Sequence, residues 1–283
     1  MKALAQWAMT SRRQAIIAVL LCFAVPLMSW FGAALLALVI LRQGWNEGAS
    51  VVLWGILPCF AWYAVGDPTP LITAIGTLAS ALVLRSSVRL ERALMLGSLL
   101  GIGLYVLLPL LLPGLVEAIT DGAHSMIKEG FSGQPDVLAK LEPILSPMII
   151  GVLAALHVLG FQLALLLGRY WQSELYNPKG FGLEFKALRL PMLYSLPCVL
   201  MLLGVAGIAP DLAGMVPVLT VPMVLAGVAL FHAVVTMKKA GTHWLVLLYA
   251  AMFMFGPYTY TLLIFIALLD SSINFRTRLK DTA

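Results

Sequence analysis

Long runs of apolar residues recur along almost the whole chain, from residue 14 to residue 269, and the charged residues lie in short segments between them. The chain is 61% hydrophobic and only 11% charged, whereas soluble domains carry about 25% charged residues. A soluble core cannot enclose this much apolar surface, so the surroundings must be lipid. The runs are contiguous and lack the alternation of a membrane β-barrel. The sequence therefore predicts an all-α, polytopic transmembrane helical bundle that forms a single integral membrane domain over residues 1–283.

Two apolar segments, residues 14–41 and 243–269, are unusually long and are interrupted, at Pro26 and at Gly256-Pro257. As one helix, the 28 residues of the first would span roughly 42 Å, well over the ~30 Å hydrocarbon core. Either one tilted helix or two shorter pieces that turn back fits this length. If both segments turn back, the chain has eight to ten membrane segments.

The basic residues indicate how these segments are oriented. If both interrupted segments turn back, sixteen of the 18 lysines and arginines fall on one side of the membrane. Only Lys128 and Lys140 then lie on the other side, together with seven of the 13 acidic residues. The positive-inside rule favours this arrangement, so we expect both termini in the cytoplasm.

Residues 114–146 form a long polar segment with five acidic residues and two lysines. Within it, Leu115, Ile119, Met126 and Ile127 recur at roughly helical spacing. This pattern is typical of helices that lie on a membrane surface. The segment is therefore predicted to be an extracytoplasmic amphipathic loop.

The remaining patterns exclude several functions. The net charge of +5 does not indicate nucleic-acid binding, because the basic residues flank apolar segments as topology signals do. Cys22, Cys59 and Cys198 are isolated, which supports neither a metal site nor a disulfide framework. No zinc-binding histidine pair, nucleophile motif or phosphate-binding loop occurs. We expect no enzymatic activity, no metal and no cofactor.

Polar and aromatic side chains inside apolar segments are the candidates for a binding site, because burying polar groups in hydrocarbon is unfavourable. Interrupted segments add free carbonyl groups, and in transporters they line the substrate site. A small-molecule site near the middle of the membrane would then be lined from both interruptions. Its candidate residues are Trp30, Tyr63, His157, His232, Tyr258 and Tyr260. The alternative is that the histidines bond across helices and that the interruptions are structural kinks.

The stretch Arg169–Pro191 is the longest mixed charged and aromatic run in the chain. Such a run fixes the depth of neighbouring helices at a membrane interface, and it also suits docking of a protein partner or of anionic lipid headgroups. The candidate docking residues are Arg169, Trp171, Tyr176, Phe185 and Arg189. Two small-residue motifs, Gly97-x-x-x-Gly101 and Ala33-x-x-x-Ala37, predict close helix contacts. Such contacts form either within the chain or with a membrane protein partner or second copy.

Residues 169–190 resemble the signature linker of the YybS-like bacterial membrane proteins, a domain-of-unknown-function family. Residues 26–44, with Pro-Leu-Met-Ser-Trp-Phe-Gly-Ala-Ala at their start and Leu-Arg-Gln-Gly at their end, look similar too, and the likeness extends across most of the chain. That family is grouped with the substrate-binding S components of energy-coupling-factor vitamin transporters. The resemblance therefore implies an S-component-like architecture in the bacterial inner membrane, although S components typically have six spans. Their Ala-x-x-x-Ala motif also lies in the first helix, whereas Ala33 and Ala37 lie later.

These observations lead to two functional hypotheses. In the first, the chain is an inner-membrane protein that binds or helps to move a small molecule. In the alternative, it is a membrane scaffold that recruits a protein partner through its basic cytoplasmic face, of which residues 169–190 are the signature linker.

Overall fold

The computed structural model describes residues 2–25 and 27–281, with the backbone alone for residues 205–207 and 279–281. Every element in this part of the chain is a helix, which confirms the all-α prediction. In chain order the helices are α1 (Lys2–Ala8), α2 (Arg12–Ala24), α3 (Ser29–Gln43), α4 (Trp45–Gly55), α5 (Leu57–Ala64), α6 (Thr69–Ser87), α7 (Leu90–Leu111), α8 (Pro113–Gly130), α9 (Pro135–Tyr176), α10 (Gly180–Ala187), α11 (Met192–Ile208), α12 (Pro210–Ala213), α13 (Met215–Met237), α14 (His243–Met254), α15 (Gly256–Ile273) and α16 (Phe275–Asp281).

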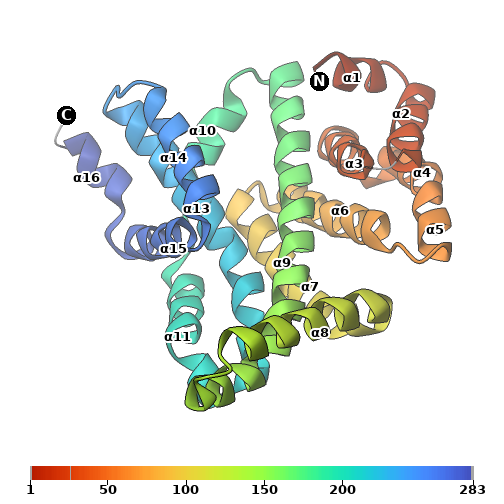
Figure 1. The fold of residues 1–283 in the computed structure, drawn as a ribbon. Helices are drawn as coiled ribbons and strands as arrows, with labels where there is room; N and C mark the ends of the chain where they lie inside the picture. The colour runs from red at the N-terminus through yellow and green to blue at the C-terminus, as the bar shows by residue number, and fades with distance from the viewer. Residues whose placement is uncertain (1, 26, 282–283) are drawn as a thin grey trace.

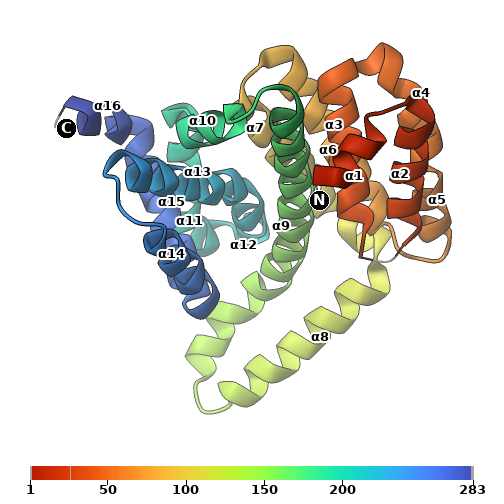
Figure 2. The same cartoon turned by 90° about the horizontal axis from the view of Figure 1, so that it is seen from above.

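Helix α9 is the centre of the molecule, with α1–α6 on one side and α10–α16 on the other (Figures 1 and 2). It packs against α3, α6 and α7 of the N-terminal part and against α12 and α13 of the C-terminal part. Its 42 residues reach about 63 Å, so it extends beyond the bundle at one end. The N-terminal and C-terminal parts therefore meet through α9 and through the packing of α7 on α13.

Helix α3 is buried by other helices along most of its length. All ten residues from Gly32 to Leu41 are buried, and α2, α4, α6 and α9 surround the helix. At roughly 22 Å, its 15 residues are too short to cross a ~30 Å hydrocarbon core. A short apolar helix of this kind is stable at membrane depth when protein encloses it.

Small residues bring these helices close together. A Cβ added at Gly168 of α9 would lie 2.5 Å from the carbonyl oxygen of Ala34 and 2.7 Å from the Cβ of Ala37. Gly97 likewise faces Gln162 of α9, at 2.6 Å, so both small-residue motifs make contacts within the chain.

Both long apolar segments are divided into two helices. The break in the second falls at Phe255, and Pro257 occupies the first turn of α15. The break in the first separates α2 from α3, while Pro26 itself lies outside the described residues. Within α13, Pro222 has no N–H to donate to the carbonyl oxygen of Val218, four residues before it. The hydroxyl of Ser98 donates a hydrogen bond of 3.2 Å to that oxygen instead.

Five helical segments of the described chain are long and apolar enough to cross a membrane: Thr69–Ser87, Leu90–Leu111, Pro135–Tyr176, Pro210–Met237 and Gly256–Ile273. The pair Gly180–Ala187 and Met192–Gly204, bent by 58°, gives a sixth if it acts as one span. The sequence predicted eight to ten segments. The numbers differ because the divided segments yield short helices such as α3 and α14, which fall below the length of a span.

Residues 114–146 were predicted to form an amphipathic loop with helices on the membrane surface, and in the structure they form a helical hairpin. Helix α8 is mostly exposed, and residues 135–146 are the first turns of α9, which continues through Pro143 and Pro147. Lys128 and Glu142 join the two helices by an ion pair of 3.3 Å. The hairpin lies at the end of the bundle opposite both termini and α10 (Figure 1).

Candidate functional site

Two adjoining cavities lie where the α2–α3 turn meets the start of α6 and the middle of α9. One has a volume of about 260 Å³ and is lined by Ser29, Trp30, Thr69, Thr73, Leu156, His157 and Gly160. The other has a volume of about 220 Å³ and is lined by Val25, Leu27, Ser29, Trp62, Asp67, Thr69 and Pro70. Because Ser29 and Thr69 line both, we treat the two cavities as one site, the Trp30–His157 groove.

His157 lines this groove and has one ring nitrogen without a hydrogen-bond partner among the described residues. Its Nδ1 lies 2.8 Å from the carbonyl oxygen of Leu153. Since a carbonyl oxygen can only accept, Nδ1 carries a proton, and in that tautomer Nε2 is the nitrogen that accepts a hydrogen bond. This Nε2 atom is buried and has no hydrogen-bond partner among the described residues. An enclosed polar atom without a partner is unfavourable, and a bound donor would relieve it.

The groove is otherwise held by bonds within the chain. The Asp67 carboxylate accepts from the backbone N–H of Thr69 at 3.0 Å, at the start of α6. The Thr73 hydroxyl donates to the carbonyl oxygen of Thr69 at 2.8 Å. The Trp30 ring packs on Phe31, with centroids 4.2 Å apart, and remains 41% exposed. An aromatic wall, two threonines and one free acceptor therefore lie together.

The other predicted ligand residues lie elsewhere. Tyr63 is half-exposed and lines neither cavity, although its neighbour Trp62 does. His232 bonds to the Tyr249 hydroxyl at 2.9 Å, and Tyr260 bonds to the hydroxyl of Thr220. Tyr258 is 81% exposed. Contrary to the prediction from the sequence, the groove is therefore not lined from both interruptions. Helix α15 packs on α11, α13 and α14 and supplies no residue to the groove.

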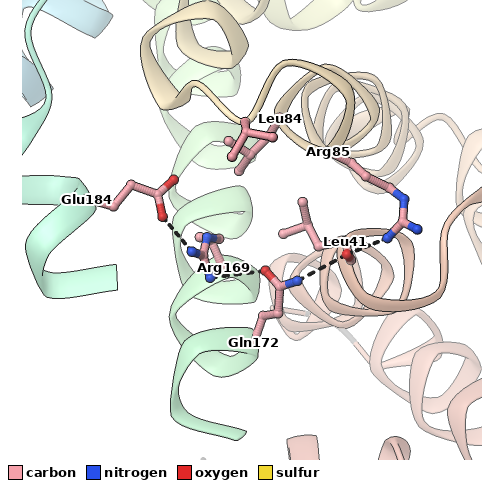
Figure 3. Close-up of a pocket in the computed structure, with 7 residues that line it drawn as sticks. Leu41, Leu84, Arg85, Arg169, Gln172 and Glu184 are labelled. Carbon is pink, nitrogen blue, oxygen red and sulfur yellow. Dashed lines mark hydrogen bonds and ion pairs between the residues drawn. The ribbon is translucent and has the colours of Figure 1, made fainter. Parts of the chain in front are cut away.

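A second cavity, of about 340 Å³, is lined by residues that include Leu41, Arg85, Arg169, Gln172 and Glu184 (Figure 3). The carbonyl oxygen of Leu41 accepts hydrogen bonds there from Arg85 at 2.6 Å and from Gln172 at 3.0 Å. Arg169 donates to Gln172 at 3.1 Å and pairs with Glu184 at 2.7 Å. The last turns of α3, α6 and α9 meet at this point, so the guanidinium groups offset the negative ends of three helices. These bonds join α3, α6, α9 and α10.

The five predicted docking residues all make contacts within the chain. Trp171 is only 1% exposed, so it is not part of a docking surface, because α9 turns it into the core. Tyr176 lies under the Arg42 guanidinium, 4.2 Å from the ring centroid, and Phe185 contacts the rings of Phe181 and His232. Arg169 is paired as described above. Arg189 donates to the carbonyl oxygens of Asp270 and Ser271, each at 2.7 Å.

Sequence reasoning missed the role of Asp270 and Arg276. The Asp270 carboxylate is 3% exposed and forms an ion pair with Arg276. Arg276 also donates to the carbonyl oxygens of Lys186 at 2.7 Å and Leu188 at 2.8 Å. The sequence signal that could have predicted this ion pair is an acidic residue at the end of an apolar run, with an arginine six residues later. The pair fastens the end of α15 to the segment after α10.

No group of His, Cys, Asp or Glu side chains within the described residues is arranged to hold a metal ion. Compared with known proteins, the chain matches no protein-family model, no curated protein and no solved structure.

Proposed function

We propose that this chain is a membrane protein that binds a small molecule in the Trp30–His157 groove, in a transport-related role. The observation that supports this most strongly is the buried, unpartnered Nε2 of His157 beside a cavity with an aromatic wall. An ionisable side chain in the middle of an apolar helix suggests a functional site, because such residues are otherwise disfavoured in membranes. The two cavities together fall within the size range of small-molecule sites.

The groove favours a neutral or weakly polar ligand with at least one O–H or N–H donor. The donor would satisfy Nε2 of His157, and a flat or apolar part would pack on Trp30. Thr73 already donates its hydroxyl proton to Thr69, so its oxygen also serves as an acceptor.

Binding is tested by native mass spectrometry of the full chain extracted in lipid nanodiscs. We expect a small molecule to co-purify with the wild type and to be reduced at least about tenfold in the double variant Trp30→Ala and His157→Ala, since a packing face and a hydrogen bond are both lost. His243→Ala with Trp244→Ala is the control, because it removes the same two side-chain types from the start of α14, outside the groove. Equal occupancy in both double variants, or no ligand in any sample, would contradict the proposal.

We also propose that the basic end of the bundle faces the cytoplasm of a bacterial inner membrane, in an S-component-like arrangement. Contacts at this end join groups far apart in sequence: Lys2 pairs with Glu174 at 3.5 Å, Arg42 lies over Tyr176, and Arg276 reaches Leu188. Both termini would then be cytoplasmic, as the positive-inside rule predicts. Five or six spans are close to the six of S components.

Orientation is tested by cysteine labelling of intact cells with a membrane-impermeant maleimide, after the three native cysteines are replaced by alanine. We expect Lys140→Cys to be labelled and Lys280→Cys to be labelled only after the cells are opened. Labelling of position 280 in intact cells would overturn this orientation.

The scaffold alternative has less support. A docking surface built on residues 169–190 would need Trp171 and Arg189 at the surface, and both are used inside the chain.

A further inference from the structure

A cavity of about 500 Å³ lies between the end of α9 and α10, at the same end of the bundle as the termini. It is lined by Tyr170, Ser173, Glu174, Lys179, Phe181, Gly182, Leu183 and Lys186. It is separate from the Trp30–His157 groove and shares no residue with it. Nothing in the proposed small-molecule role uses it.

The wall of this cavity is fixed in place. The Ser173 hydroxyl, which is buried, donates to the carbonyl oxygen of Asn177 at 2.7 Å and accepts from the backbone N–H of Phe181 at 2.9 Å. The Tyr170 and Phe181 rings meet edge to face, 6.0 Å apart. The Ser173 hydroxyl therefore joins the end of α9 to the start of α10, and the Tyr170–Phe181 ring pair forms part of the cavity wall.

Two cations in this cavity lack the partners that neighbouring cations have. Arg169, Arg189 and Arg276 are each bonded to a carboxylate or to carbonyl oxygens. Lys179 and Lys186 have no ion pair or side-chain hydrogen bond among the described residues. Glu174 also lines the cavity, but its carboxylate pairs with Lys2 at 3.5 Å. The cavity thus presents two ammonium groups that are free to bind an anion.

Apolar surface lies beside these cations. Leu183 is 68% exposed and Tyr170 is 42% exposed. The α10 helix directly follows the candidate span Pro135–Tyr176 and is bent by 58° from Met192–Gly204, so it lies at the end of α9. Basic groups next to exposed apolar and aromatic side chains at a membrane interface suit a ligand that is anionic at one end and apolar at the other.

We propose that this cavity binds an anionic phospholipid, with the headgroup phosphate on Lys179 and Lys186 and an acyl chain against Leu183. A soluble anion could use the lysines but would leave the apolar face uncovered. A protein partner is less favoured, because Arg169 and Arg189 are already bonded within the chain and Trp171 is buried.

The test uses the full chain in nanodiscs of zwitterionic phosphatidylcholine with a minor fraction of phosphatidylglycerol, and native mass spectrometry reads the lipids that stay bound. We expect phosphatidylglycerol to be retained preferentially, and Lys179→Gln with Lys186→Gln to lower its retention by roughly tenfold. The control is Lys238→Gln with Lys239→Gln, which removes the same charge from the α13–α14 turn at the same end.

Leu183→Asn, which keeps both lysines, separates a lipid from a soluble anion. It should also lower phosphatidylglycerol retention, and added inorganic phosphate should not displace the lipid. Displacement by phosphate without an effect of Leu183→Asn would overturn the lipid assignment. Equal loss in the two lysine pairs, or equal retention of both lipids, would show that the cavity has no specific role. A protein that replaces the lipid in cell membranes would also count against the proposal.

Discussion

Gly151→Ala is expected to destabilise the protein by about 3 kcal/mol or more, among the largest effects of any single methyl group in the chain. A Cβ at Gly151 of α9 would overlap the carbonyl oxygen of Gly214, at the start of α13. Both sides of this contact are backbone, so neither can move aside as a flexible side chain would. A Cβ at Gly214 would in turn overlap the carbonyl oxygen of Pro147, so α9 is close to Gly214 at two positions. Thermal unfolding in detergent measures the loss.

Gly160→Ala, in the same helix, is the control. No atom lies within 4 Å of a Cβ at Gly160, so alanine should be neutral or should stabilise by up to about 1 kcal/mol through its higher helix propensity. If the two variants melt at the same temperature, the close approach of α9 and α13 is wrong. That approach matters for function because α9 also carries His157.

Arg276→Met is expected to cost about 3–5 kcal/mol, because it leaves the Asp270 carboxylate buried without its partner. The Asp270 side chain is 4% exposed and that of Arg276 is 13% exposed. The variant also frees the carbonyl oxygens of Lys186 and Leu188, which only a new donor could satisfy. We expect a lower unfolding temperature and faster proteolysis after residue 186, where the segment is released.

The double variant Asp270→Asn with Arg276→Met should be more stable than Arg276→Met alone, since the buried charge is gone. Lys128→Gln is the control, because the Lys128–Glu142 pair is exposed and should contribute less than about 1 kcal/mol. A loss of similar size in Lys128→Gln and Arg276→Met would contradict the burial of the Asp270–Arg276 pair.

Much of the fold follows from the pattern of apolar residues. The runs predict helices, and the interruption at Gly256-Pro257 predicts the division between α14 and α15, which the structure has. The same runs do not distinguish a helix that faces lipid from one that faces protein, since both are apolar. Burial of α3 on every side was therefore not predictable, and neither was the resulting number of spans. Likewise, the polar segment 114–146 did not show that its last residues join the following apolar run in one helix, α9, which continues through Pro143 and Pro147.

Part of the groove could be predicted, because Trp30 and His157 are unusual in apolar segments and the structure brings them to one cavity. The threonines beside them could not, since Thr69 and Thr73 are ordinary helix residues whose position depends on packing. The sequence also did not predict that Tyr258 and Tyr260 lie away from Trp30, because the packing partners of α15 cannot be predicted from its apolar pattern. At the basic end, the charge pattern did not show which side chains are used in bonds within the chain, such as Arg169 and Arg189.

The most direct test of the small-molecule proposal is a single-particle cryo-electron microscopy map of the full chain in lipid nanodiscs, at a resolution that shows side chains. The proposal predicts non-protein density in the groove, about 3 Å from Nε2 of His157 and packed on the Trp30 ring. A closed groove in which Nε2 of His157 bonds to a protein atom, with no density beside Trp30, would contradict it.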